Sequence, residues 1–232
     1  VKRSEMDFIF SYYEQDGENS PVTGGIGTEQ LTDFTAKIIL KVPIKKKNEV
    51  NLDAGIDYYT SASTDMIDDR MSSASRKDLR THGNVGYTRL SPKRKMSYGF
   101  KIGGSTEYDY QSVSASASFS KSSKDNNRTI GVDAKALIDS WEIYYPRELR
   151  GQDWVTTNQR RTYSVTFSYS QVLTKRLQGS IVMEGIQQSG LLGTPFHRVY
   201  FQEQNDAKVE NLPFNRIKIP VGLRLNYYAH DY

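Results

Sequence analysis

The chain has 232 residues with a formal net charge of +4, and 25% of its residues are charged against 37% that are hydrophobic. Its longest stretches without Asp, Glu, Lys or Arg cover only residues 162–174 and 185–197, so no membrane-spanning helix of about 20 apolar residues fits anywhere. Cysteine is absent, which excludes disulfide scaffolds, zinc–thiolate sites and thiol nucleophiles. The length suits one domain, and we predict a single domain over residues 1–232.

Short clusters of basic residues occur at 45–47, 93–95, 160–161 and 175–176. A nucleic-acid interface would interleave such clusters with stacking aromatic residues in a recognisable module, which this chain lacks, so we predict that nucleic acid is not a partner. The chain begins Val-Lys-Arg-Ser without the apolar core of a signal peptide, as expected of either a cytoplasmic protein or a mature exported one.

Apolar and polar residues alternate repeatedly along the chain, which predicts half-buried strands. The pattern is clearest at 113–120, where Val, Ala, Ala and Phe share one face and four serines share the other. We predict about ten strands of about ten residues each and no amphipathic helix. In chain order they cover residues 5–13, 34–42, 50–58, 79–90, 96–108, 113–120, 128–139, 162–173, 177–188 and 216–225.

Connection lengths alternate between short and long. The predicted short turns are 44–49, 91–95, 121–127 and 174–176, and the long connections are 14–31, 61–78, 140–161 and 189–213, with a tight turn at 107–109 as the exception. Outer-membrane barrels show this asymmetry, and strands of 9–11 residues cross a bilayer when tilted. We therefore predict an all-β, antiparallel, up-and-down transmembrane β-barrel of at least ten strands in the outer membrane of a Gram-negative bacterium. Its N-terminus would be periplasmic; a soluble β-sandwich is the non-membrane alternative.

Tyrosine is unusually frequent, with 16 residues, and tyrosines fall near the ends of the predicted strands. Amphipathic rings prefer the two membrane interfaces, so this placement predicts two aromatic girdles. Strand propensity alone would explain the number of tyrosines but not their positions. The predicted girdle residues are Tyr12, Tyr58, Tyr108, Tyr110 and Tyr144 at the outer interface, and Tyr87, Tyr98, Tyr169 and Tyr227 at the periplasmic one.

The polar positions of the strands would line the barrel lumen, because the apolar face looks outward at lipid. Their mixed charges predict ion pairs that tie strands together, while an excess of basic residues would favour anions if the lumen were open. An eight- to ten-stranded barrel is mostly filled by its own side chains. The predicted lumen residues are Asp7, Lys37, Lys41, Asp53, Asp57, Arg80, His82, Lys101, Asp133, Lys135, Asp139, Glu184, Arg216, Lys218 and Arg224.

Three short segments resemble an outer-membrane β-barrel family of unknown function found mainly in Bacteroidota. They are Gly25–Phe34 (GIGTEQLTDF), Tyr59–Asp68 (YTSASTDMID) and Ser72–Ser75 (SSAS). The resemblance implies an outer-membrane location and a single barrel domain, and it implies no established activity. Members of this family are longer, with further strands after the point where this chain stops.

The C-terminal segment agrees with that comparison. Outer-membrane barrels usually end in an apolar-alternating strand closed by an aromatic residue. Counting back by twos from Tyr232 reaches the polar residues Asn226 and Arg224, whereas the apolar register contains Tyr227 and Leu225. We therefore expect the chain to be truncated at its C-terminus and the barrel to have more than ten strands.

His82 is the main candidate for catalytic chemistry. It shares the predicted lumen face with Arg80 and Asn84, and the adjacent strand offers Asp53 and Asp57, so an Asp–His pair could orient a general base. A hydrogen-bond network that satisfies polar groups inside a narrow barrel explains the same residues. Because no nucleophile or second carboxylate cluster lies in a recognisable motif, we predict that the protein is not an enzyme.

The loop at 61–78 contains Asp65, Asp68 and Asp69, whose carboxylates could bind calcium. The spacing does not match an EF-hand, and a solvated acidic loop is the preferred interpretation. No cofactor motif is present, so we predict no cofactor apart from this calcium alternative.

The predicted function is that of a structural or accessory subunit of an envelope complex. Its partner surface would be loop 141–161, which carries Trp141, Tyr145 and Trp154. Other partners would be outer-membrane lipid, lipopolysaccharide and further envelope proteins. A passive, porin-like channel or transporter for small polar or anionic solutes is the alternative, and an outer-membrane hydrolase is less favoured. The basic turns could contact lipid headgroups or a periplasmic partner, although ordinary turn composition explains them more simply.

Overall fold

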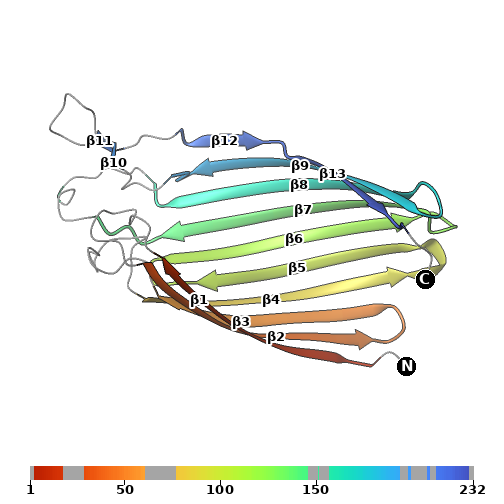
Figure 1. Ribbon diagram of the computed structural model, residues 1–232, viewed down its shortest axis with the longest axis horizontal. Coiled ribbons are helices and arrows are strands. Elements are labelled where there is room, and N and C mark those ends of the chain that lie inside the picture. Colours follow the sequence, from red (N-terminus) through yellow and green to blue (C-terminus); the bar gives the residue numbers. More distant parts are fainter. Residues whose placement is uncertain are drawn as a thin grey trace.

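A computed structural model describes residues 3–17, 29–60, 77–145, 151, 157–193, 198–199, 208–209 and 213–229. Eleven strands form one antiparallel sheet, in which β1 to β9 lie side by side in chain order and β12 and β13 both pair with β9 (Figure 1). The main strands are β1 (Glu5–Gly17), β2 (Glu29–Ile44), β3 (Asn48–Thr60), β4 (Lys77–Ser91), β5 (Met96–Thr106), β6 (Tyr110–Ser122), β7 (Arg128–Trp141), β8 (Gln159–Val172), β9 (Leu177–Gly190), β12 (Asn215–Lys218) and β13 (Val221–Tyr227). The short strands β10 (Arg198–Val199) and β11 (Lys208–Val209) pair only with each other.

The predicted all-β, up-and-down order and the predicted minimum of ten strands are confirmed. The nine strands β1 to β9 are 11 to 16 residues long, somewhat longer than the predicted ten. No helix in the described part of the chain is long and apolar enough to cross a membrane; the one helical element there is the 3-10 turn η1 (Pro92–Arg94).

The predicted last strand is divided at Pro220. Both β12 and β13 pair with β9, and the pairs Lys218↔Ile186 and Val221↔Met183 are three residues apart on each side, so the register continues across the break. Proline has no N–H to donate to the ladder, which explains the interruption. The carbonyl of Pro220 still accepts a hydrogen bond from the Glu184 N–H at 3.0 Å. The two segments therefore occupy one strand position, the tenth.

Both ends of the sheet have the predicted character. Strand pairs β2–β3, β4–β5, β6–β7 and β8–β9 are joined at one end by short turns, which we call the short-turn end. The longer connections lie at the opposite, long-loop end, with the tight β5–β6 turn as the exception (Figure 1). The non-glycine residues with positive φ, Lys45, Lys95 and Asn126, all lie in short turns, where left-handed backbone allows the chain to reverse.

The sheet has two chemically different faces. Along β6 the serines from Ser112 to Ser122 occupy one side and Val113, Ala115, Ala117 and Phe119 the other, because side chains of a strand alternate between faces. The ladders of the neighbouring strands mostly keep polar opposite polar and apolar opposite apolar, with Ser114↔Leu137 and Lys121↔Ile130 among the exceptions. We call these the polar face and the apolar face.

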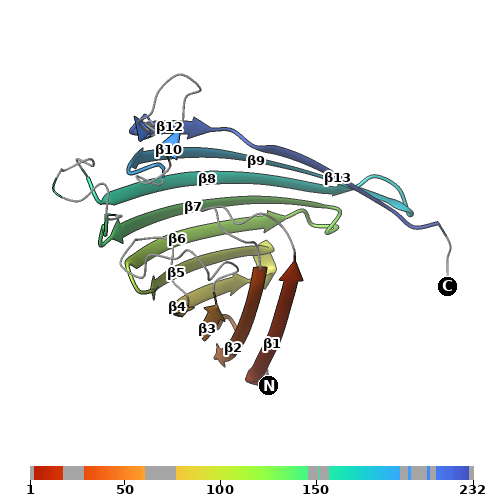
Figure 2. The same cartoon turned by 60° about the vertical axis from the view of Figure 1, so that its left-hand side comes forward.

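Side chains on the apolar face are widely exposed, for example Phe10 at 70%, Leu223 at 70% and Val113 at 59%. The polar positions of β6 are mostly less exposed than the apolar ones. The sheet is strongly curved (Figure 2), and one ion pair described below, between Lys101 on β5 and Asp53 on β3, reaches across the intervening strand β4 on the polar face. The polar face is therefore the inner side of the curl.

The curled sheet is open among the described residues. Strand β1 pairs only with β2, and β12 and β13 pair only with β9. The described strands therefore form an open sheet and do not close into the barrel predicted from the sequence, and each edge strand among them leaves one row of backbone groups unpaired. Since β1 and the β12–β13 position run in opposite directions, the two edges have the polarity that antiparallel closure requires.

Candidate functional site on the polar face

The charged residues predicted to line a lumen all lie on the polar face. The ladders place Asp57 opposite Arg80, Asp53 opposite Asn84, and Lys135 opposite Ser116 and Ser164. The complete set on this face is Asp7, Lys37, Lys41, Asp53, Asp57, Arg80, His82, Lys101, Asp133, Lys135, Asp139, Glu184, Arg216, Lys218 and Arg224. The structure divides them into a paired group and an unpaired group.

Asp53 is the centre of the first paired cluster. Its carboxylate accepts a hydrogen bond of 2.7 Å from the Asn84 side-chain amide. It also forms ion pairs with Lys101 Nζ at 3.2 Å and Lys37 Nζ at 3.9 Å. These partners come from β2, β4 and β5, so one carboxylate on β3 links four strands.

A glycine makes room for this cluster. A Cβ at Gly103, which faces Asn84 across the β4–β5 ladder, would lie 1.9 Å from the Asn84 side-chain oxygen. The same relation holds at Gly55, where a Cβ would lie 2.7 Å from the His82 ring. Glycines on the polar face thus admit bulky polar side chains from the next strand.

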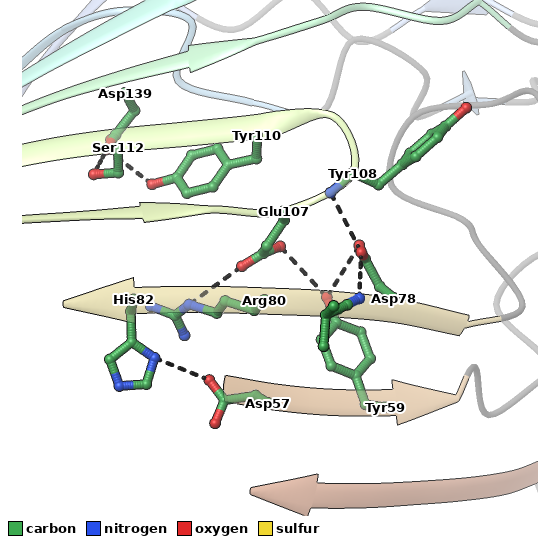
Figure 3. A network of polar contacts seen from close by, with 11 residues as sticks. Asp57, Tyr59, Asp78, Arg80, His82, Glu107, Tyr108, Tyr110, Ser112 and Asp139 are labelled. Carbon is green, nitrogen blue, oxygen red and sulfur yellow. Dashed lines mark hydrogen bonds and ion pairs between the residues drawn. The ribbon is translucent and has the colours of Figure 1, made fainter. Parts of the chain in front are cut away.

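His82 lies near Asp57, as the sequence predicted, with Nδ1 3.4 Å from the Asp57 carboxylate (Figure 3). The geometry is not that of a hydrogen bond, and His82 Nδ1 has no hydrogen-bond partner within the described ranges. The opposite ring nitrogen, Nε2, lies over Gly55. A general base needs its free nitrogen within hydrogen-bond reach of a proton to abstract, and among the described side chains no hydroxyl contacts either nitrogen.

A second cluster lies at the long-loop end, between β3, β4 and the β5–β6 turn (Figure 3). Glu107 contacts Arg80 Nε at 3.4 Å, and the Tyr59 hydroxyl lies 3.4 Å from Glu107 and 3.5 Å from Asp78. The Tyr108 N–H donates to Asp78 at 3.3 Å. Burial raises the pKa of Glu107 even though the Arg80 guanidinium acts in the opposite direction.

Asp139 forms the most completely satisfied cluster, on β6, β7 and β8. It is 2% exposed and accepts hydrogen bonds from the Tyr110 hydroxyl at 2.8 Å, the Ser112 hydroxyl at 2.7 Å and Arg160 Nε at 2.8 Å. The Arg160 guanidinium lies 4.9 Å above the Trp141 ring. Sequence reasoning did not find the Asp139–Arg160 pair, because their register depends on the long connection between β7 and β8.

The predicted girdle is largely on the apolar face. Tyr12, Tyr58, Tyr87, Tyr98, Tyr169 and Tyr227 all alternate to that face. Tyr110 is the exception: it lies on the polar face in the Asp139 cluster, so its assignment to the girdle was wrong. Tyr108 lies in the β5–β6 turn and stacks against Tyr144, with ring centroids 5.6 Å apart. A hydrogen bond to Glu142 raises the pKa of Tyr144 to about 12.

The predicted partner loop and calcium loop are described only in part. Trp141 lies on the polar face against Tyr110, with ring centroids 5.1 Å apart, and Tyr145 follows β7. Trp154 and the predicted calcium ligands Asp65, Asp68 and Asp69 lie outside the described residues. Within the described ranges there is no group of three or more His, Asp or Glu side chains that could hold a metal ion.

Comparison of the chain with protein-family models, with curated proteins and with solved structures finds no match in any of the three.

Proposed function

We propose that this chain is the membrane-spanning wall of an outer-membrane β-barrel and acts as a structural or accessory subunit rather than as an enzyme. The observation that carries this proposal is the exposed apolar face, which continues across the sheet from Phe10 on β1 to Leu223 on β13. Water is a poor solvent for such a surface, whereas lipid tails suit it.

The size of the apolar face supports a membrane environment. Ten strand positions at a spacing of ~4.8 Å, with an apolar band ~20 Å tall, present roughly 1,000 Å². Monomeric soluble proteins rarely expose a contiguous apolar patch above about 300–600 Å². A soluble β-sandwich would need a second sheet to cover this face, and the described residues provide none.

The positions of the tyrosines also support it. Tyr58 is the register partner of Leu79, and Tyr87 lies eight residues further along β4 on the same face. Eight residues span about 26 Å, which projects to roughly 20 Å when strands tilt by about 40°. Outer-membrane barrels carry aromatic girdles on either side of an apolar band about 25 Å tall.

This proposal assigns an orientation to the sheet. The short turns would face the periplasm and the long loops the exterior, as in bacterial outer-membrane barrels. The β7–β8 connection, which begins after Trp141 and includes Tyr144 and Tyr145, would then offer an aromatic surface to an envelope partner. Aromatic residues are enriched at protein interfaces.

A passive channel is the second candidate, and one observation favours it. Whereas Asp53 and Asp139 are paired, Asp133, Lys135, Glu184, Lys218 and Arg224 form no ion pair among the described residues. Charges without partners need water, so this part of the polar face would line an aqueous interior once the sheet is completed.

Reconstitution of the detergent-purified protein into planar bilayers tests both candidates. Stable insertion without discrete conductance steps is the result expected of a structural barrel. Conductance steps whose ion preference reverses on Arg224→Glu would establish the channel. A protein that stays monodisperse in buffer without detergent and does not enter bilayers would contradict both.

A further inference from the structure

The apolar face contains a hollow over β6 and β7, between β5 and β8, where small side chains replace large ones. Two cross-strand pairs of alanines form it, Ala117↔Ala134 and Ala115↔Ala136. Phe100 on β5 and Val165 on β8 flank the first pair in register, and Tyr163 on β8 flanks the second. Together with these walls, the alanine rows form an open surface groove of about 340 Å³, within the range of about 300–1,000 Å³ that is typical of ligand sites.

Two basic side chains lie on the same face at the short-turn end of this groove. On β6, Ala117, Phe119 and Lys121 all face the apolar side of the sheet, because alternate residues of a strand share a face. On β7, Ala134, Ile130 and Arg128 face the same side. Both basic side chains are exposed, and neither is paired with a carboxylate in the part of the chain that the structure describes.

The spacing between groove and charges matches one lipid chain. Lys121 lies four residues from Ala117 and Arg128 six residues from Ala134, which corresponds to about 13 and 20 Å along the strands and to roughly 10 and 15 Å along the membrane normal at a tilt of about 40°. One leaflet contributes about 15 Å of the 30 Å hydrocarbon core. An acyl chain lying in the groove would therefore place its phosphate near these two cations.

A second groove on the apolar face has only one basic residue at its short-turn end. It is about 490 Å³ in volume and lies over Ala36 and Ala54 with walls formed by Phe8, Phe10 and Ile56. The rows that lead from it to the short-turn end are mostly apolar and end at Ile44 on β2, Asn48 on β3 and one basic residue, Arg89 on β4. Both grooves are apolar, and the β6–β7 groove differs in having two basic residues at its short-turn end where the second groove has one.

We propose that the β6–β7 groove is a binding site for one anionic glycerophospholipid, with an acyl chain over the alanine floor and the phosphate on Lys121 and Arg128. This inference rests on the proposed membrane location, and it adds a specific lipid to it. The orientation assigned above places the site in the periplasmic leaflet, where the lipid would fasten the β6–β7 hairpin to the membrane.

Native mass spectrometry of the full chain in detergent tests the site, with phosphatidylglycerol and phosphatidylcholine offered at equal concentration. The wild type is expected to retain one phosphatidylglycerol in preference to phosphatidylcholine. Each basic side chain near an anionic headgroup contributes about a fivefold preference. The double variant Lys121→Glu/Arg128→Glu should therefore lose a preference of about 25-fold, whereas the control Lys46→Glu/Lys175→Glu on other turns should change it by less than twofold.

Filling the grooves gives an independent test that leaves the charges unchanged. Ala117→Leu/Ala134→Leu should abolish retention of the lipid, and Ala36→Leu/Ala54→Leu should not. Equal losses in both charge variants, or no preference in the wild type, would overturn the proposal. Insertion of each variant into vesicles is measured in parallel: a wild type that inserts but retains no lipid refutes this site alone, and one that does not insert refutes the membrane assignment as well.

Discussion

Removal of the Asp139 carboxylate should be among the most destabilising single changes on the polar face. Its side chain is 3% exposed, and it accepts hydrogen bonds from Tyr110, Ser112 and Arg160. Asp139→Ala would leave two hydroxyl groups and a guanidinium without their acceptor. Breaking a buried ion pair by removing one partner costs about 3–5 kcal/mol. Because the Arg160 side chain is 28% exposed and can regain water, we expect the lower limit, about 3 kcal/mol.

Two further variants separate charge from hydrogen bonding. Asp139→Asn keeps one acceptor oxygen but removes the charge, so we expect a loss of about 2 kcal/mol, as for a hydrogen bond to a charged group. Asp133→Ala is the matched control, because Asp133 lies on the same strand and face but is exposed and unpaired. Surface changes of this kind usually stay within about 0.5 kcal/mol.

The assay is urea unfolding in detergent, followed by the fluorescence of Trp141 in a Trp154→Phe background. Trp141 contacts Arg160 and Tyr110, so its emission reports directly on the cluster. The reasoning is refuted if Asp139→Ala and Asp133→Ala unfold at the same urea concentration.

Three other changes have defined outcomes. Gly103→Ala should lower the free energy of unfolding by about 1–3 kcal/mol, because the new Cβ displaces Asn84 from its hydrogen bond to Asp53. The control Gly185→Ala has open space around the new Cβ and should change the free energy of unfolding little in the same urea titration. Burial raises the folded-state pKa of Glu107 above its usual value of 4.5, so the folded state binds more protons than the unfolded state between the two pKa values. The free energy of unfolding therefore falls as the pH rises from 4.5 through the folded-state pKa. Glu107→Gln should remove this decline, as measured by melting curves recorded at successive pH values. Lys45→Asn should increase the free energy of unfolding by about 0.5 kcal/mol, because Asn tolerates the positive φ of this turn better than Lys. A higher melting temperature of the variant would show this gain.

The fold could be predicted from the sequence because its information is local. The alternation at 113–120 fixes which side chain faces which side of the sheet, and turn length fixes which strands are neighbours. The break at Pro220 was equally local, but it was overlooked because the apolar alternation continues on both sides of the proline. The face on which Tyr110 lies could also be predicted from the sequence, because Tyr110 precedes Ser112 by two residues and so shares the face of the alternating serines.

The contacts on the polar face could be predicted only in part. Asp57 and His82 lie on strands joined by residues 61–76, and their proximity was expected from pairing of neighbouring strands. The Asp139 cluster depends instead on the residue-level register between β7 and β8, which the long connection leaves undetermined. The grooves on the apolar face depend on cross-strand pairs of alanines, which become visible only once the register is known.

Lipid contact along β6 tests the central claim most directly. The chain contains no cysteine, so single cysteines can be placed at successive positions from 113 to 119, labelled with a fluorophore and reconstituted into vesicles that contain lipids with chain-attached quenchers. The account predicts strong quenching at Val113, Ala115, Ala117 and Phe119 and weak quenching at Ser114, Ser116 and Ser118. Uniform quenching, or none at any of the seven positions, would contradict it.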